Sequence, residues 1–296
     1  MFHLRSGWVM VSEVGDFLQS PSQNKIKMEL NTELNLAKSL ACEAGRHIMK
    51  YYSIENKHFT MKNEADYTSP VTKADLIANK LIVTSLRSTF KEDGILSEEE
   101  KDGPSRLLKK RVWIIDPLDG TKEFIAGSPE FTVNIALVID HKPVLGVIYL
   151  PARDELYYAS KEKGAFCTIQ GKIQKMQVSN HKTFDGMVIV KSRLHGDQRL
   201  HDFLDENKFK SVLSIGSSLK GCLVAKAEAD AYVRFGNTHE WDVCAMDCIV
   251  RQAGGTMTNL DGKILKYNQK NTILDGFIVS NTISHPELIH KIGKMK

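Results

Sequence analysis

The stretch VWIIDPLDGT, residues 112–121, runs from an apolar strand directly into a segment that carries two carboxylates. Pro117 lacks an N–H and disfavours helix at Asp116, so we expect the chain to turn there. The side chains of Asp116 and Asp119 can then converge on one point, with the Leu118 carbonyl between them. Carboxylate and carbonyl oxygens are the hard ligands that Mg²⁺ prefers. This stretch therefore predicts a metal site at the end of a buried strand.

The same segment allows other interpretations, which its spacing separates. Gly120 and Thr121 predict a turn whose N–H groups can hold a phosphate oxygen where a helix begins. A plain strand-ending turn is the alternative, because Asp, Pro and Gly all favour turns. An EF-hand loop would need Glu at its twelfth position, but the twelfth residue counted from Asp116 is Gly127. A phosphatase with an Asp nucleophile in an Asp-x-Asp pair would need carboxylates two apart, whereas these are three apart.

Two further places along the chain offer acidic side chains. The run Glu98-Glu99-Glu100 follows a short apolar stretch, and Glu240-Trp241-Asp242 precedes a helical pattern. Each has an ordinary alternative, since a run of Glu is typical of a solvated face and an acid at a helix start interacts favourably with the helix dipole. The order of the three acidic segments is what favours a shared site.

The rest of the chain predicts an α/β protein. A helix is expected from Leu30, and a second from Thr72, whose capping box would include Asp75. Strands are expected at 112–115, 131–138, 143–150, 155–159, 187–190, 212–215 and 231–234, and helices from Gln198, Leu219 and Trp241. Residues 174–185 are polar and predicted to be irregular. We therefore expect an N-terminal extension (1–29), an α+β domain with the main metal ligands (30–180), and an α/β domain that completes the active site (181–296).

Composition places the chain among ordinary globular proteins. Of its 296 residues, 42% are hydrophobic and 26% charged, and 40 Lys and Arg against 36 Asp and Glu give a formal net charge of +4. This excess is too small for a nucleic-acid polymer, and no apolar run reaches the roughly 18 residues of a membrane span. Five scattered cysteines without a Cys-x-x-Cys pair predict reduced thiols in a cytoplasmic protein. Peripheral association with a membrane surface is compatible with this composition, and the oligomeric state is left open.

The ordered acidic motifs resemble those of the inositol monophosphatase superfamily of metal-dependent, lithium-sensitive phosphatases. The common parts are LSEEE (96–100), DPLDGT (116–121), and WD (241–242) followed by a helix and Gly-Gly. Further motifs are similar to the 3'(2'),5'-bisphosphate nucleotidase (CysQ) branch: SPVTKAD (69–75), GTKEF (120–124), SRLH (192–195), GSSLK (216–220) and RFGNTHEWD (234–242). The likeness extends from residue 33 to residue 285. It departs after Asp242, where the branch commonly has Thr-Ala-Ala-Gly and this chain has Val243-Cys244-Ala245-Met246.

The resemblance implies a layered α-β-α-β-α sandwich, of the type shared with fructose-1,6-bisphosphatase, with a magnesium-dependent active site. About two or three Mg²⁺ ions would be held by Glu98, Asp116, the Leu118 carbonyl, Asp119 and Asp242. Thr121, helped by Asp75, would orient and deprotonate the attacking water. The substrate would contact the metal ligands Glu98, Leu118, Asp119 and Asp242, together with Gly120, Thr121, His195, Gly216, Lys220 and Trp241.

The chemistry expected of such a site is hydrolysis of a phosphomonoester by metal-activated water. Gly216-Ser217-Ser218 before a helix predicts a second anion site, to which Lys220 adds a charge. We therefore expect a small phosphorylated nucleotide as substrate: adenosine 3',5'-bisphosphate, hydrolysed to AMP, and its sulfated relative. The alternatives are an inositol-1-phosphate or sugar monophosphatase of the same superfamily, and a catalytically silent binding protein. The intact set of acids argues against the silent protein.

Overall fold

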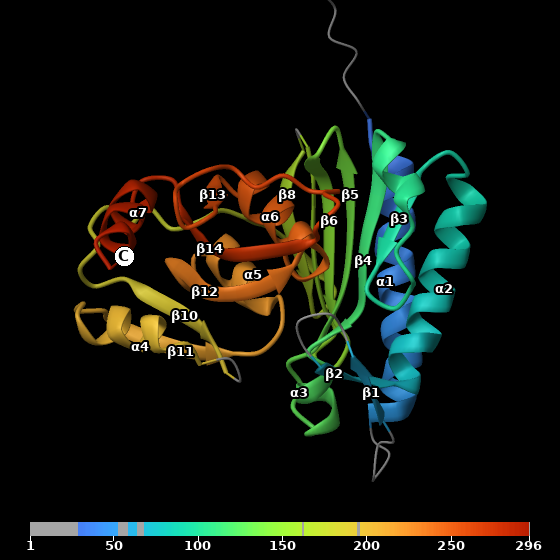
Figure 1. Cartoon of the computed structure of the whole chain (residues 1–296), viewed down its shortest axis with the longest axis horizontal. Helices are drawn as coiled ribbons and strands as arrows, with labels where there is room; N and C mark the ends of the chain where they lie inside the picture. Colours follow the sequence, from blue (N-terminus) through green and yellow to red (C-terminus); the bar gives the residue numbers. More distant parts are fainter. Residues whose placement is uncertain (1–28, 53–58, 64–67, 162, 194–195, 296) are drawn as a thin grey trace, which may run out of the picture.

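The computed structural model describes residues 29–52, 59–63, 68–161, 163–193 and 196–295, and within these ranges the elements form five layers, α-β-α-β-α (Figure 1). One outer layer holds α1 (Asn31–Tyr52) and α2 (Lys73–Thr89). The central layer holds α5 (Leu219–Ala225) and α6 (Glu240–Gln252), and the other outer layer holds α4 (Gln198–Asp205) and α7 (His285–Gly293). This arrangement confirms the predicted layered sandwich.

The larger sheet contains seven described strands in the order β3-β4-β5-β6-β7-β8-β9. It is antiparallel except for the β3–β4 pair. Successive side chains of a strand point to opposite faces, and the central strands are mostly apolar because both of their faces are buried. The strands are β3 (Gly94–Ser97), β4 (Arg111–Asp119), β5 (Thr132–Ile139), β6 (Lys142–Leu150), β7 (Glu155–Ser160), β8 (Gly164–Ile169) and β9 (Lys172–Met176).

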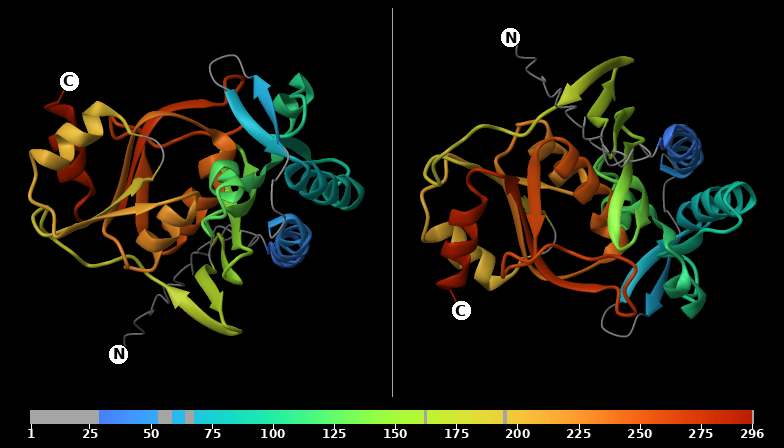
Figure 2. Two further views of the ribbon diagram at one scale, coloured as in Figure 1. Left: turned by 90° about the horizontal axis from the view of Figure 1, so that it is seen from below. Right: turned by 90° about the horizontal axis from the view of Figure 1, so that it is seen from above.

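The smaller sheet contains five described strands in the order β11-β10-β12-β14-β13. Its strands are β10 (Val188–Ser192), β11 (Ser211–Ile215), β12 (Ala231–His239), β13 (Gly255–Thr258) and β14 (Ile273–Asn281). A separate hairpin pairs β1 (Phe59–Asn63) with β2 (Thr68–Thr72), and two short helices complete the described elements, η1 (Pro104–Leu108) and α3 (Thr121–Ile125). The two views of Figure 2 show α5 and α6 between the sheets.

Three apolar clusters hold the layers together. The first lies between α1, α2 and the large sheet, the second between the two sheets around α5 and α6, and the third between the small sheet and the pair α4 and α7. The predicted boundary near residue 180 falls between β9 and β10, where the chain passes from one sheet to the other. Since the middle cluster draws side chains from both sheets, the two parts share a core, and their division into domains stays a prediction.

Several predicted elements agree with the structure. The helices expected from Leu30 and Thr72 are α1 and α2, and Thr72 caps α2 in a capping box with Asp75. The strands expected after residue 111 are β4 to β7 and β10 to β12, each within a few residues.

Other elements correct the predictions. The interval 174–185, predicted to be irregular, begins inside β9, an edge strand whose first four residues are exposed and polar except for one, so the apolar alternation of a half-buried strand is missing. The expected turn at Asp116 is a register shift between Asp116 and Asp119, and β4 continues through it. Pro117, which cannot donate to the ladder, therefore lies at an irregularity of the strand.

Candidate active site

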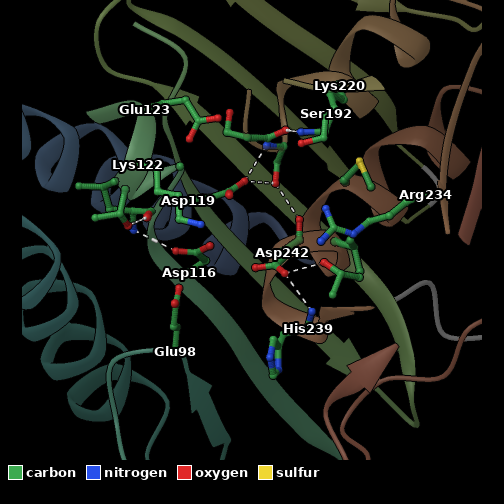
Figure 3. A pocket seen from close by; sticks show the side chains of 18 of the residues that line it. Glu98, Asp116, Asp119, Lys122, Glu123, Ser192, Lys220, Arg234, His239 and Asp242 are labelled. Atoms are coloured by element: carbon green, nitrogen blue, oxygen red, sulfur yellow. Dashed lines mark hydrogen bonds between the residues drawn. The ribbon is translucent and has the colours of Figure 1, made fainter. Parts of the chain in front are cut away.

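A cavity of about 300 Å³ opens where the end of β4 meets α5 and the start of α6 (Figure 3). Its lining carries charges of both signs. The acidic side chains that line it are those of Glu98, Asp116, Asp119, Glu123 and Asp242, and the cationic ones are those of Lys122, Lys220 and Arg234. Because both sheets contribute, the cavity exists only when the two parts of the chain are packed together.

Three of the predicted metal ligands converge in this cavity. Asp116, Asp119 and Asp242 each offer a carboxylate oxygen, and these oxygens lie within 4.8 Å of one another. Strand alternation places Asp116 on the same face of β4 as Ile114, toward α6, and the register shift brings Asp119 to that face as well. Asp242 comes from the first turn of α6, where it forms a capping box with His239.

Hydrogen bonds fix one oxygen of each carboxylate. Asp116 Oδ1 accepts from the Leu118 N–H at 3.0 Å. Asp242 Oδ2 accepts from the Thr238 hydroxyl at 2.6 Å and from the His239 N–H at 2.9 Å. Such partners restrict the orientation of the two carboxylates, as expected of groups that support metal ligands.

The electrostatics of this cluster fit a small cation. Burial, and then the charges of Glu98 and Asp119, raise the pKa of Asp116 well above its usual range. Burial and the charge of Asp242 likewise raise the pKa of Asp119, although Lys220 opposes this. Like charges this close disfavour ionisation unless a positive charge lies between them, and the oxygen donor set suits a hard divalent ion.

Glu98 lies on the side of Asp116 that is opposite Asp119 (Figure 3). It is half-buried, and burial followed by the charges of Asp242 and Glu99 raises its pKa well above the usual value. Its backbone carbonyl accepts a hydrogen bond from Lys62 of the β1–β2 hairpin, and Lys62 also pairs with Glu99 at 3.7 Å. Of the acidic run, Glu98 is the member that lines the cavity, and it lies outside the set of three carboxylates within 4.8 Å of one another.

Thr121 and Asp75 meet as predicted. The Thr121 hydroxyl lies 3.1 Å from Asp75 Oδ1 and 3.2 Å from the Leu118 carbonyl oxygen. Asp75 Oδ2 accepts from the N–H and the hydroxyl of Thr72, at 2.8 and 2.5 Å. Burial raises the pKa of Asp75, although these hydrogen bonds oppose the shift. Asp75 thus serves as a capping residue and also faces Thr121, so the two roles coexist.

Of the residues predicted to hold a second phosphate, Ser217, Ser218 and Lys220 line the cavity, and Gly216 is not among the lining residues. Lys220 is buried in the cavity wall, and its ammonium donates to the Ser217 carbonyl at 2.5 Å. The N–H of Gly216 donates to Glu130 Oε2 at 2.7 Å, and the N–H of Ser218 donates to Asp119 Oδ2 at 2.6 Å. These two N–H groups already have acceptors inside the protein, and an anion site at Gly216-Ser217-Ser218 stays a prediction.

Trp241 lies behind this cavity. Its indole ring stacks on the His239 imidazole, with ring centroids 4.4 Å apart and planes 5° from parallel. Trp241 lines a second cavity of about 460 Å³ that adjoins the first at Glu98, His239 and Ile273. Gly120 lines the first cavity, as predicted, and its φ of 90° suits glycine where α3 begins. His195 lies outside the described residues.

The structure adds cavity residues that the sequence did not single out. Arg234 ends the strand predicted at 231–234 and begins the motif RFGNTHEWD, but it was not predicted to have a role in the site. Tyr232 shares this strand and lies under Lys220, whose ammonium is 5.3 Å from the ring centroid. Glu123, in the motif GTKEF, is buried at the cavity wall. Asn134 does not line the cavity but donates to the Ser218 hydroxyl, and it carries no sequence signal because it lies inside the mostly apolar strand β5.

Comparison with known proteins places the chain in a family. The model of the inositol monophosphatase family matches residues 29–295. The chain belongs to the inositol monophosphatase family. Phosphatases of this family use divalent metals, which agrees with the acidic cluster formed by Asp116, Asp119 and Asp242.

Individual relatives fall in the CysQ branch of this family. The 3'(2'),5'-bisphosphate nucleotidase CysQ of Escherichia coli strain K12 is 40% identical over 243 residues, which cover 81% of this chain and 96% of the relative. The protein of the same description from Buchnera aphidicola is 37% identical and covers 79% of this chain and 87% of the relative. In the part of the chain that the structure describes, the helices are too short or too polar to cross a membrane.

Solved structures agree with this placement. CysQ from Bacteroides thetaiotaomicron superposes with a TM-score of 0.72 at 35% identity, covering 84% of this chain and 97% of the other. The Thermotoga maritima inositol monophosphatase TM1415 superposes with a TM-score of 0.75 at 26% identity, covering 89% and 98%. The family fold is therefore present over nearly all of the described chain.

Proposed function

We propose that the chain is a Mg²⁺-dependent 3'(2'),5'-bisphosphate nucleotidase that hydrolyses the 3'-phosphate of adenosine 3',5'-bisphosphate to give AMP. The observation that carries the proposal is the pairing of an acidic cluster with cationic side chains in one cavity. The relatives named CysQ support the same activity. The sulfated relative of this nucleotide, which has the same 3'-phosphate, is a second expected substrate.

The acidic side of the cavity is the proposed reaction centre. Asp116, Asp119, Asp242, Glu98 and the Leu118 carbonyl would hold Mg²⁺ there, in about two or three ions. When bound, these ions neutralise charge on the phosphoryl oxygens, lower the pKa of a bound water and stabilise the leaving alkoxide. Because the ligands come from β4, the end of β3 and α6, the centre requires the larger sheet and the central helix layer to be packed together.

Thr121 and Asp75 would activate the attacking water. The Thr121 hydroxyl donates its proton to Asp75 Oδ1 or to the Leu118 carbonyl, which leaves an oxygen lone pair to accept a hydrogen bond from water. When the water loses its proton to Thr121, the Thr121 proton can pass to Asp75. Because burial raises the pKa of Asp75, this carboxylate is a stronger base than an exposed one.

The cationic side of the cavity would bind the second phosphate of the substrate. Lys220 and Arg234 come from α5 and β12, and each side chain reaches the cavity. Arg234 donates to the backbone carbonyl of Asn237 at 2.6 Å, which fixes the guanidinium beside the cavity mouth. A substrate with one phosphate at the acidic cluster and another near these cations fits the charge distribution better than an inositol monophosphate does.

The test is release of phosphate with Mg²⁺ from three compounds at equal concentrations: adenosine 3',5'-bisphosphate, AMP and inositol 1-phosphate. We expect rapid release from the bisphosphate, and none from AMP, because AMP lacks the 3'-phosphate. Lys220→Ala should raise KM for the bisphosphate more than it lowers kcat, since Lys220 would bind the group that does not react. If inositol 1-phosphate were the better substrate, the nucleotidase assignment would fail while the metal centre would stand.

A further inference from the structure

The hydroxyl of Ser218 lies at a junction between the two halves of the acidic cluster. It is 2.6 Å from Asp119 Oδ2, which belongs to β4, and 2.7 Å from the backbone carbonyl oxygen of Asp242, which belongs to α6. The third neighbour is the side-chain amide nitrogen of Asn134 on β5, at 2.9 Å. Ser218 is 3% exposed and Asn134 1% exposed, so water does not compete for these hydrogen bonds.

Asp119 is held by one of its two oxygens. Among the described residues, the hydrogen bonds that Asp119 accepts all end on Oδ2. The N–H of Ser218 donates at 2.6 Å, the hydroxyl of Ser218 lies at 2.6 Å, and the side chains of Asn134 and Thr132 each lie at 3.4 Å. The carboxylate is thus clamped through Oδ2, and one of its oxygens lies within 4.8 Å of carboxylate oxygens of Asp116 and Asp242.

Asn134 determines how the Ser218 hydroxyl can point. A hydroxyl has one proton to donate and two lone pairs to accept with. The Asn134 amide donates to the Ser218 oxygen, so the Ser218 proton is left for the two acceptors that flank it, Asp119 Oδ2 and the Asp242 carbonyl. Either choice ties Ser218 to an element that carries a carboxylate of the cluster. Asn134 is therefore connected to the cluster chiefly through Ser218.

We infer that Ser218, supported by Asn134, is a positioning residue that fixes the position of the Asp119 carboxylate relative to Asp242 for metal binding. The inference rests on the metal centre of the proposed function, and it assigns Ser218 no contact with the substrate. Groups behind a metal ligand commonly change metal affinity by about 10–100-fold when they are removed. Since Ser218→Ala keeps the backbone N–H on Asp119, we expect a loss near the lower end, roughly tenfold.

The experiment measures binding of Mn²⁺, as a probe for the divalent site, to the metal-stripped protein by isothermal titration calorimetry without substrate. Ser218→Ala should raise the Kd about tenfold. Asn134→Leu, of similar size but without the amide, should raise it in the same direction and serves as a second variant if Ser218→Ala does not fold. The control is Ser160→Ala, because Ser160 is buried in β7 and its hydroxyl has no hydrogen-bond partner among the described residues. Its Kd should match that of the unmodified protein.

The outcomes separate two roles of Ser218 from each other and from a failure of the metal centre itself. A positioning role predicts a raised Kd for Mn²⁺ in both variants and a higher Mg²⁺ concentration for half-maximal activity, with KM for the nucleotide at saturating Mg²⁺ unchanged. A merely structural role would lower the melting temperature of both variants and leave the Kd where it is, and that result overturns the inference. Absence of Mn²⁺ binding to the unmodified protein would instead overturn the metal centre of the proposed function.

Discussion

Gly221 on α5 faces Met246 on α6, one of the four residues where the chain departs from the family pattern after Asp242. A Cβ at position 221 would lie 2.0 Å from Met246 Cγ and 2.2 Å from Met246 Sδ, but 3.4 Å from Met246 Cβ. Gly221→Ala must therefore displace the methionine side chain or the helix. Overpacking of this kind costs about 1–3 kcal/mol, and replacing a helical glycine by alanine returns about 1 kcal/mol. We expect a net loss of up to about 2 kcal/mol in the free energy of unfolding.

The sign of this effect should reverse when Met246 is shortened. In a Met246→Ala background the two clashing atoms are gone and only the ordinary contact at 3.4 Å remains. Met246→Ala alone should cost about 2–5 kcal/mol, and adding Gly221→Ala should then stabilise the protein by up to about 1 kcal/mol. Urea unfolding of the four proteins measures the coupling, and Gly293→Ala is the matched control because nothing lies within 4 Å of a Cβ there. Equal destabilisation by Gly221→Ala in both backgrounds would refute the reasoning.

Three further predictions test the site and the fold. Thr121→Val keeps the shape of the side chain but removes the hydroxyl between water and Asp75, so kcat should fall by about 10²–10⁴-fold. The rise in melting temperature on adding Mg²⁺ should stay. Undiminished turnover would remove Thr121 from the mechanism. Asp119→Asn should abolish both turnover and that Mg²⁺-induced rise, because the ligand loses its charge; a persisting rise would place the ion elsewhere. Burial lowers the pKa of His285 to about 4 from 6.5, so its contribution to stability is present above pH 6.5 and is lost as the pH falls toward 4. At pH 5 this loss amounts to roughly 2 kcal/mol, and urea unfolding at pH 7 and pH 5 should show a smaller decline for His285→Gln than for the unmodified protein; equal declines would contradict the assignment.

The fold was predictable where the local sequence pattern indicates a helix or a strand. Thr72 and Asp75 form the capping box that their spacing predicts, and the apolar runs of β4 to β7 are long enough to identify buried strands. The β1–β2 hairpin and β9 gave no such signal. In β9, Lys172 to Lys175 are exposed, so pairing with β8 determines the strand, and hydrophobic alternation does not. The position of β9 at the sheet edge depends on tertiary structure and cannot be predicted from the local sequence.

For the site, sequence reasoning found the charged groups and missed what holds them. Asp116 and Asp119 were evident because two carboxylates directly after an apolar strand are unusual and indicate a binding site. Asn134 was not, since a polar residue in a strand is an ordinary feature, and Ser218 was predicted only as part of an anion site and not as a partner of Asp119. For Gly216, the sequence also failed to show a hydrogen-bond partner. Its N–H looked available for an anion, but Glu130, remote in sequence, already occupies it.

The position of Asp242 relative to β4 depends on a contact well away from the carboxylates. A Cβ at Gly146 of β6 would lie 2.4 Å from the backbone carbonyl oxygen of Ala245 and 3.0 Å from Cys248 Cβ, so α6 rests directly on the strand at this glycine. Ala245 is less than one turn of helix from Asp242, and a helix packed this closely moves as a unit. A side chain at position 146 would push α6 away from the large sheet, and Asp242 would move with it while Asp116 and Asp119 stay on β4. The geometry of the acidic cluster is thus fixed in part by the absence of a side chain in the core.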